Sequence, residues 1–284
     1  MFKNLSPTAV GIKANLQQSI DLARRFGFGG VDLPVAEIAT LADQRGAQAV
    51  RGLFDAAGLK PGAFGCPTNF RADEATWETG LAGLPRLAKA AAAVGGTRCS
   101  SSIPPASDVL DYAANFELHV SRLEPIARIL KDHGIRFGIE FIGPKTARRG
   151  KKHAFIWTME GALELCDAIG TGNVGLALDA WHWHTSHATL DDIRKLKPED
   201  VVCVHVNDAP RGIAVDELPD QPRELPAATG VIDLKGFLQA LKEIGYDGPV
   251  TAEPFRKDLA AMPADQTAKL VSEAMDKLWT IAGL

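Results

Sequence analysis

The fold class follows from three successive segments, IRFGIEF (135–141), MEGALELCDAI (159–169) and VGLAL (174–178). The first and third are short apolar runs of the length and composition typical of buried strands. The segment between them spaces its apolar residues as an amphipathic helix does. Two strands joined by such a helix lie parallel in one sheet. This unit therefore predicts an α/β protein with a parallel sheet.

The same alternation repeats along the chain and predicts eight strands. We expect strands at Thr8–Ile12, Gly30–Leu33, Pro61–Phe64, Arg98–Ser102, Ile135–Phe141, Val174–Leu178, Val201–Val206 and Pro249–Ala252. We expect helices at Leu16–Phe26, Ile38–Ala57, Thr76–Val94, Asp108–His133, Met159–Ile169 and Leu234–Ile244. Eight such units in about 250 residues match a (β/α)8 TIM barrel. The alternative is a doubly wound open sheet, but no GxGxxG motif follows the first strand.

The composition indicates a soluble protein that lacks the excess of basic residues needed to bind a polyanion. Of 284 residues, 46% are hydrophobic and 23% charged, and the formal net charge is −4. Without a basic field we expect no nucleic-acid partner. No run of about 18 apolar residues is present, so we expect no membrane span. Since no linker or low-complexity stretch divides the chain, we expect one barrel domain covering residues 1–284.

The cysteines and the first residues favour a cytoplasmic protein. Cys66, Cys99, Cys166 and Cys203 lie far apart and form no CxxC pair. This spacing is typical of reduced thiols rather than of a disulfide framework or a structural zinc site. The opening residues MFKNLSPTAVGIKANLQ lack the apolar core of a signal peptide. The sequence leaves the oligomeric state open, and a homo-oligomer is compatible with it.

Four consecutive predicted strands end on residue types that bind metals. These residues are Glu140, Asp179, His205 and Glu253. Active sites of (β/α)8 barrels form at the C-terminal ends of the strands. The residues two positions earlier, which share the same face, are all small: Gly138, Ala177, Cys203 and Thr251. An isolated acid at a strand end is most often a helix cap or an ion-pair partner, but four in succession favour one divalent site. Such a set suits Mn²⁺, the favoured candidate, or Mg²⁺, Co²⁺ or Zn²⁺.

Further candidate residues follow the predicted ligands. They are Trp181, His182 and His184 in AWHWHTS, Arg211 six positions after His205, and Arg223 in QPRELPAATG. Aromatic faces beside imidazoles recur where proteins hold polyols, so these residues are candidates for substrate binding. The alternative is that the tryptophans cover the barrel mouth and that the arginines are ordinary solvated charges.

At these residues the sequence resembles the xylose isomerase-like family of sugar isomerases and epimerases. GIEF, LALDAWHWH, VCVHVND and VTAEPF match the places where that family binds a divalent metal through Glu, Asp, His and Glu. The D-x-x-H spacing of Asp179 and His182 and the position of Arg211 match as well. Within the family, residues 135–255 are most similar to the inosose isomerases of inositol breakdown. The first half of the chain carries no equally diagnostic motif.

The resemblance implies an isomerase or epimerase that acts on a keto-polyol or ketose. Glu140 and Glu253 would then be catalytic residues that exchange a proton with substrate carbon, while the metal stabilises the enediolate. His182 and Arg211 would hold substrate oxygens. A keto-polyol dehydratase of the same fold is the nearest alternative. An AP endonuclease would need histidines at the early strands, which are absent, and a non-catalytic sugar-binding barrel would not need the pair of glutamates.

The substrate predicted in this way is unphosphorylated, with an inosose favoured and a ketohexose next. Against this, the loop KTARRGKKHAFIW (145–157) is long and basic, and its charges together with Arg211 and Arg223 could hold a phosphate. No glycine-rich phosphate loop accompanies these side chains, and scattered arginines bind a dianion less securely than an array of backbone N–H groups.

Overall fold

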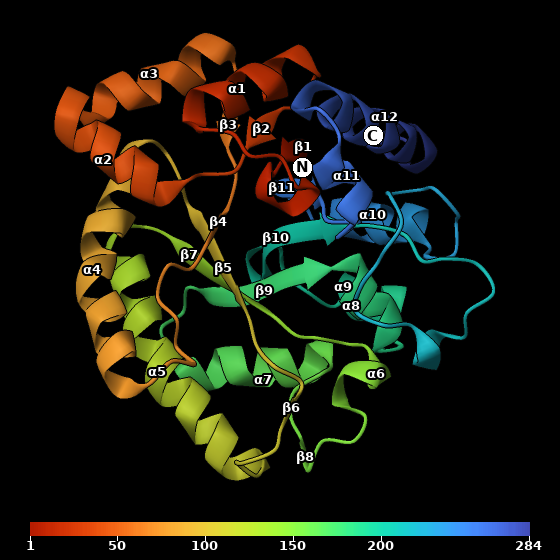
Figure 1. Cartoon of the computed structure of the whole chain (residues 1–284). Helices are drawn as coiled ribbons and strands as arrows, with labels where there is room; N and C mark the ends of the chain where they lie inside the picture. The colour runs from red at the N-terminus through yellow and green to blue at the C-terminus, as the bar shows by residue number, and fades with distance from the viewer.

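The computed structural model describes residues 1–284, and its centre is a parallel sheet enclosed by helices (Figure 1). The neighbours in this sheet follow the order β3-β2-β1-β11-β10-β9-β7-β5-β4. The strands are β1 Phe2–Leu5, β2 Gly30–Val31, β3 Lys60–Pro61, β4 Phe64–Gly65, β5 Arg98–Ser102, β7 Arg136–Glu140, β9 Val174–Asp179, β10 Val201–Val206 and β11 Pro249–Ala252.

The segments β3 and β4 are two halves of one strand, and they close the barrel. β3 pairs with β2 at one end of the strand order, and β4 pairs with β5 at the other end. Between them, the Gly62 N–H donates to the Val31 carbonyl and the Ala63 carbonyl accepts from the Leu33 N–H. The two ends of the order are therefore one continuous segment. The predicted (β/α)8 TIM barrel is confirmed.

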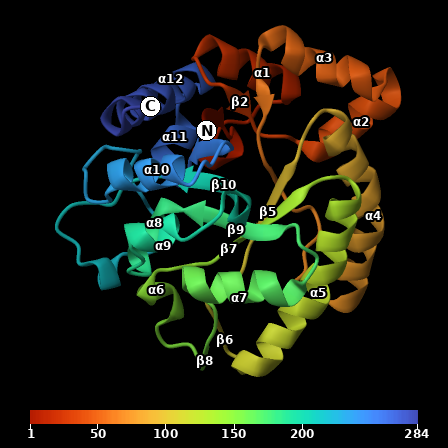
Figure 2. The same cartoon turned by 180° about the vertical axis from the view of Figure 1, so that it is seen from behind.

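Helices surround the barrel on all sides, as the two opposite views show (Figures 1 and 2). They are α1 Leu16–Arg25, α2 Val35–Arg45, α3 Ala47–Ala57, α4 Glu74–Ala93, α5 Tyr112–Asp132, α6 Lys145–Arg148, α7 Met159–Ile169, α8 Ala180–Thr185, α9 Leu190–Arg194, α10 Leu234–Glu243, α11 Lys257–Ala261 and α12 Ala264–Ala282. A short antiparallel pair, β6 Ala106–Ser107 with β8 His153–Ala154, lies outside the barrel. None of the helices combines the length and apolar character needed to cross a membrane.

Two predicted elements are wrong. The first strand is Phe2–Leu5, not Thr8–Ile12, and Thr8–Val10 instead forms a short 3-10 helix. Pro7 precedes it, and the fixed φ of proline favours a turn there. The helix predicted at Ile38–Ala57 is two helices that meet at Gly46. Its φ of +81° is a conformation that only glycine adopts at little cost.

The barrel interior is filled by small residues, as the alternation along the strands predicts. Ala63, Ala177 and Cys203 form a buried cluster of their own inside the barrel. The intervening apolar residues of the strands, such as Leu178 and Val204, belong to the large core between sheet and helices. At Gly138 an added Cβ would lie 3.1 Å from Val202 Cβ. This packing leaves space above the small residues for polar side chains at the mouth.

Candidate metal centre

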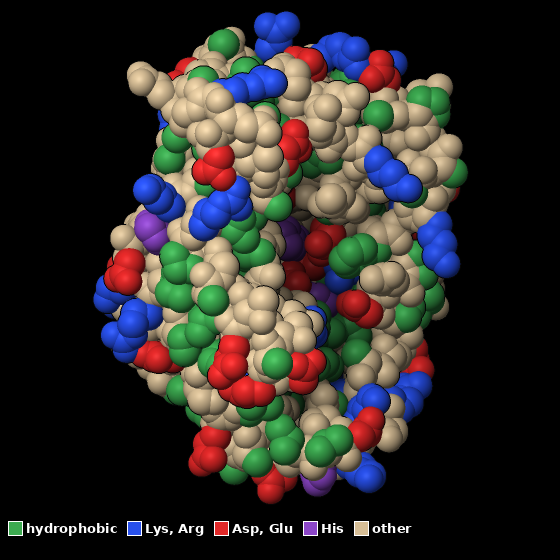
Figure 3. All heavy atoms as spheres, turned by 60° about the vertical axis from the view of Figure 1, so that its left-hand side comes forward, with side chains coloured by type: hydrophobic (Ala, Val, Ile, Leu, Met, Phe, Trp, Pro, Cys, Tyr) green, Lys and Arg blue, Asp and Glu red, His purple; other side chains and the backbone are tan.

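The four predicted ligands meet at the C-terminal mouth of the barrel. One ligand atom from each of Glu140, Asp179, His205 and Glu253 lies within 4.8 Å of the others. The Asp179 side chain is fully buried, whereas those of Glu140, His205 and Glu253 are 14%, 17% and 14% exposed. Figure 3 shows acidic and histidine side chains at the bottom of a hollow on this face. The cluster is therefore reachable by a small molecule.

The register of the strands explains why these side chains converge. Asp179 is the last residue of β9 and lies directly opposite His205 on β10. Glu253 follows β11, and its N–H donates to the Val206 carbonyl over 3.0 Å. Glu140 ends β7, the other neighbour of β9. Each side chain thus points inward from the end of its own strand.

The charges of the cluster are coupled through His205. Its Nδ1 lies 3.0 Å from Glu140 Oε1 and 3.5 Å from Glu253 Oε2. Burial lowers the pKa of His205, but the charges of Glu253 and Glu140 outweigh burial and hold this pKa well above its ordinary value. Burial raises the pKa of Glu253 to about 8, and the neighbouring carboxylates act in the same direction. Both shifts are those of a site with an excess of negative charge.

A guanidinium, that of Arg223, is buried inside the cluster. Its Nη1 donates to Asp179 Oδ2 over 2.6 Å and to Glu253 Oε2 over 3.2 Å. Its Nη2 donates to Asp220 Oδ1 over 3.1 Å. The guanidinium carbon lies 5.3 Å from the centre of the Trp181 ring. Burial opposes the charge, but the carboxylates hold the pKa of Arg223 above its ordinary value.

Hydrogen bonds to both carboxylate oxygens fix the orientation of Asp179. Oδ1 accepts from the Trp181 N–H over 2.8 Å and from Asn207 Nδ2 over 2.9 Å. Oδ2 accepts from Arg223. Although burial acts against it, the charges of Arg223 and of the neighbouring histidines hold the pKa of Asp179 below its ordinary value. Asp179 is therefore a permanently ionised group of fixed orientation.

His182 is fixed beside this group by the short helix α8. It lies one helical turn after Asp179, so both side chains are on one side of the helix. His182 Nδ1 accepts from the Gly143 N–H over 3.2 Å, and its Nε2 lies 3.3 Å from Arg223 Nη2, so a donor faces each ring nitrogen. Burial lowers the pKa of His182, which keeps the ring neutral. An added Cβ at Gly143 would lie 2.4 Å from the His182 carbonyl oxygen, so only glycine allows this approach.

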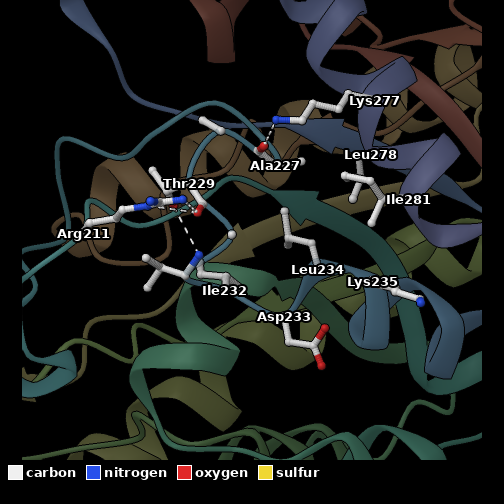
Figure 4. Close-up of a pocket in the computed structure, with 13 residues that line it drawn as sticks. Arg211, Ala227, Thr229, Ile232, Asp233, Leu234, Lys235, Lys277, Leu278 and Ile281 are labelled. Carbon is white, nitrogen blue, oxygen red and sulfur yellow. Dashed lines mark hydrogen bonds between the residues drawn. The ribbon is translucent and has the colours of Figure 1, made fainter.

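Two other candidate residues, His184 and Arg211, lie elsewhere, and so does Trp183, the second tryptophan of AWHWHTS. Trp183 packs on Phe237 with ring centres 5.4 Å apart and faces the helix layer, not the mouth. His184, two residues after His182, has a buried Nε2 without a hydrogen-bond partner and is outside the cluster. Arg211 donates to the Thr229 carbonyl and lines a separate cavity of about 550 Å³ (Figure 4). None of the four clustered residues lines that cavity.

Three cations of the basic loop that follows Glu140 form ion pairs with acidic side chains. Lys145 pairs with Asp216 over 2.7 Å, and Arg149 pairs with Glu217 over 2.7 Å. Lys151 pairs with Asp108, also over 2.7 Å. These cations are therefore neutralised by neighbouring loops and do not form a free anion site.

The structure adds residues that the sequence analysis missed. Asn207 supports Asp179, and Asp220 holds the outer nitrogen of Arg223. Asn207 lies two positions after His205, and this shared face was the available signal. Asp220 is in a loop and gave no such signal.

The donor set fits a divalent cation. Three carboxylates and one imidazole nitrogen surround one point, and the protein supplies only the single charge of Arg223 against them. An excess of two negative charges remains when His205 is neutral. Carboxylate oxygen and imidazole nitrogen suit Mn²⁺, Co²⁺ and Zn²⁺, and the oxygens also suit Mg²⁺.

Comparison with known sequences finds a matching family and relatives that are isomerases. A sequence profile described as xylose isomerase-like TIM barrel matches residues 20–279. An inosose isomerase of Bacillus subtilis (strain 168) is 31% identical over 153 residues, which are 53% of this chain and 52% of that protein. The matched segment thus spans about half the length of this relative.

Two solved structures extend the likeness to the whole chain. A xylose isomerase domain protein from Alicyclobacillus acidocaldarius subsp. acidocaldarius is 31% identical, with a TM-score of 0.86 and 99% of both chains covered. The IOLI protein, solved with a bound zinc atom, is 18% identical, with a TM-score of 0.79 over 100% of this chain and 98% of that one. The second likeness concerns the fold.

Proposed function

Since this chain belongs to the xylose isomerase-like TIM barrel family, we propose that it is a divalent-metal-dependent isomerase or epimerase of a keto-polyol or ketose. One observation carries the proposal: Glu140 and Glu253 reach the same centre from different strands, with His205 Nδ1 within 3.5 Å of both. Two carboxylates that flank one bound substrate can act as base and acid. The similarity to inosose isomerase supports the same class of reaction.

In this proposal Glu140, Asp179, His205 and Glu253 hold the metal, with Mn²⁺ favoured. The ion would act as a Lewis acid on the carbonyl and hydroxyl oxygens of the substrate and so stabilise the enediolate. Asn207 and Arg223 would orient Asp179, because ligating carboxylates are usually hydrogen-bonded in turn.

Proton transfer is assigned to the two glutamates. One carboxylate removes the proton from the carbon beside the carbonyl. A carboxylate then returns a proton either to the same carbon from the opposite face, which gives the epimer, or to the former carbonyl carbon, which gives the isomer. The substrate lies between the two groups because they come from β7 and from the end of β11, with β9 and β10 between them. Each such transfer contributes about 10²–10⁴-fold to the rate.

The substrate class follows from the remaining side chains. The imidazole of His182 and the guanidinium of Arg223 lie beside Asp179, where they would offer polar contacts to hydroxyl or carbonyl oxygens, and Trp181 backs the guanidinium. Arg211 is not part of this set because it lies in the separate cavity. Since Lys145, Arg149 and Lys151 of the basic loop are already paired with acids, an uncharged substrate is favoured. An inosose is the first candidate and a ketohexose the second.

The test is proton exchange. The Mn²⁺-loaded protein is incubated in D₂O with a panel of inososes and ketohexoses, and the carbon-bound hydrogens are followed by NMR. We expect loss of one hydrogen signal beside the carbonyl and appearance of the isomer or epimer. Absence of exchange with every member of the panel would refute the proposal, and formation of a dehydrated product would reassign the protein as a dehydratase.

A further inference from the structure

All four candidate metal ligands lie between residues 140 and 253, but one carboxylate from near the N-terminus faces the same barrel axis. This is Asp32, directly after β2. Asn4 lies opposite Thr251 on β11 and opposite Gly30 on β2. Two residues further along each strand are Ser6, Glu253 and Asp32, which therefore form one row across three neighbouring strands. The row continues the site from Glu253 to the opposite side of the mouth.

Two hydrogen bonds to one oxygen fix the position of the Asp32 carboxylate. Oδ1 accepts from Asn4 Nδ2 over 2.6 Å and from the Ala63 N–H over 3.0 Å. Asn4 Nδ2 also donates to Thr251 Oγ1 over 2.9 Å, so the arrangement is tied to the strand that leads to Glu253. An added Cβ at Gly62 would lie 2.6 Å from Asp32 Oδ1, and glycine is thus required there. The Ser6 hydroxyl is a further hydrogen-bond partner of this carboxylate.

Asp32 does not have the usual structural role of an acid after a strand. The helix that follows, α2, has Pro34 at its N-cap and receives no side-chain capping bond. Instead Asp32 lines a cavity of about 130 Å³, together with Thr8, Leu33, Phe64 and others. The four clustered residues do not line this cavity, and the row shared with Glu253 is what places Asp32 at the same mouth. Burial raises the pKa of Asp32, while hydrogen bonds from Ser6 and Asn4 and the charge of His205 oppose this. The effect of the His205 charge on Asp32 agrees with two side chains that face the same barrel axis.

We propose that Asp32, with the neighbouring Thr8 hydroxyl, binds hydroxyl groups at the end of the substrate remote from the metal ligands. This inference rests on the proposed function and narrows its substrate class. A carboxylate can accept about four hydrogen bonds, so Asp32 can accept more from substrate hydroxyls, and its charge repels a phosphate or carboxylate. The substrate must therefore be uncharged and hydroxylated at both ends.

The separation of the two sides of the site fits such a molecule. Asp32 and Glu253 lie two strands apart, which corresponds to about 10 Å between backbones. A six-carbon polyol with a hydrogen bond of about 2.8 Å at each end can bridge this gap. Leu33 and Phe64 add apolar surface for the carbon skeleton.

The test measures binding without turnover. Calorimetry gives the Kd of myo-inositol and of its monodeoxy analogues for the Mn²⁺-loaded protein. We expect Asp32→Asn to weaken myo-inositol binding by about 10- to 100-fold, the effect of a hydrogen bond to a charged group, while Mn²⁺ affinity stays within twofold. One monodeoxy analogue should lack the hydroxyl that Asp32 binds. Wild type should bind this analogue as weakly as Asp32→Asn binds myo-inositol, and Asp32→Asn should bind the analogue no more weakly than it binds myo-inositol.

Controls separate this inference from the proposed function. Asp21→Asn, at an exposed acid of α1, should leave the Kd unchanged. Thr8→Val, at the surface of the cavity, should weaken binding severalfold and replaces Asp32→Asn if that variant does not fold. Unchanged Kd in these cavity variants, or no polyol binding by wild type, would overturn the inference. If wild type exchanges hydrogen in D₂O but Asp32→Asn has an unchanged Kd, only the role of Asp32 is refuted. If Asp32→Asn has a weakened Kd but wild type shows no exchange, only the isomerase proposal is refuted.

Discussion

Arg223 and Asp179 form a buried ion pair, with Nη1 and Oδ2 separated by 2.6 Å and side chains that are 1% and 0% exposed. Water compensates neither charge. The guanidinium also reaches Glu253, so it contacts two of the four clustered ligands. Removing it would leave buried carboxylates without a partner.

We predict that Arg223→Gln destabilises the metal-free protein by about 3–5 kcal/mol, the usual result of deleting one partner of a buried pair. Saturating Mn²⁺ should recover part of this loss, because the ion supplies positive charge to the same carboxylates. Thermal unfolding with and without Mn²⁺ measures both effects. Arg211→Gln is the matched control and should change stability by less than about 0.5 kcal/mol. Equal effects of the two substitutions would contradict the placement of Arg223.

The two arginines also show where sequence reasoning reached its limit. Strand ends could be predicted because alternation and the parallel fold fix the direction of residues such as Glu140 and Asp179. Arg211 and Arg223 both lie in the long loop after β10, and the path of a loop depends on tertiary contacts that no local period records. The spacing from His205 therefore favoured Arg211, whereas the structure brings in Arg223.

The same limit explains the errors in the elements. The strand Phe2–Leu5 has a short, mixed sequence, and its pairing with β11 is a contact between the two ends of the chain. The helix break at Gly46 depended on one residue in a continuous helical pattern. Asp32 could not be recognised either, because its partner Asn4 and its level with Glu253 appear only after the barrel closes.

The metal ligands give a second prediction. Asp179→Asn and His205→Ala should each lower Mn²⁺ affinity by at least about 100-fold, since even outer partners of ligands typically cost 10–100-fold. Calorimetric titration measures the affinity, and a crystal structure with Mn²⁺ should show ligand distances of about 2.0–2.4 Å. Asp216→Asn, in an exposed ion pair with Lys145, serves as the control. If both ligand variants kept the Mn²⁺ affinity of wild type, these residues would not form the metal site.

A third prediction concerns the two glutamates. Glu140→Gln and Glu253→Gln keep the size of the side chain but remove its ability to accept a proton, so each should lower kcat by about 10²–10⁴-fold. Circular dichroism should show an intact fold. Hydrogen exchange into D₂O at the substrate carbon should fall in parallel with kcat. Near-normal turnover in either variant would exclude that glutamate from proton transfer, and Glu217→Gln on the exposed loop should behave as wild type.

Metal binding should depend on pH in a defined direction. In the metal-free protein the pKa of Glu253 is about 8 and that of His205 is raised, so both groups must lose protons before they can bind an ion. Mn²⁺ affinity should rise roughly tenfold per pH unit for each proton released as pH approaches 8. Calorimetry in two buffers of different ionisation enthalpy counts these protons, and affinity independent of pH between 6 and 8 would contradict the shifts.

The stability of the metal-free protein should follow the opposite trend. Because both pKa values are higher in the folded state than in the unfolded chain, these groups favour folding most at low pH. Their contribution is lost as pH rises through the folded values, which for Glu253 means between about 4.5 and about 8. The Tm should therefore fall over this window relative to Glu253→Gln.

The final prediction separates a free sugar from its phosphate ester. Lys145 and Arg149 are paired with Asp216 and Glu217, and Asp32 lies on the far side of the mouth, so the charges of these residues do not favour a phosphate. We expect kcat/KM for an unphosphorylated keto-polyol or ketohexose to exceed that for its phosphate ester by at least tenfold. Steady-state kinetics on matched pairs, at one ionic strength, measures this ratio because screening by salt changes charge effects. Asp32→Asn should reduce the discrimination, since it removes a repulsive charge. A large preference for the ester, abolished by Arg211→Ala or Arg223→Ala, would show instead that the arginines form a phosphate site.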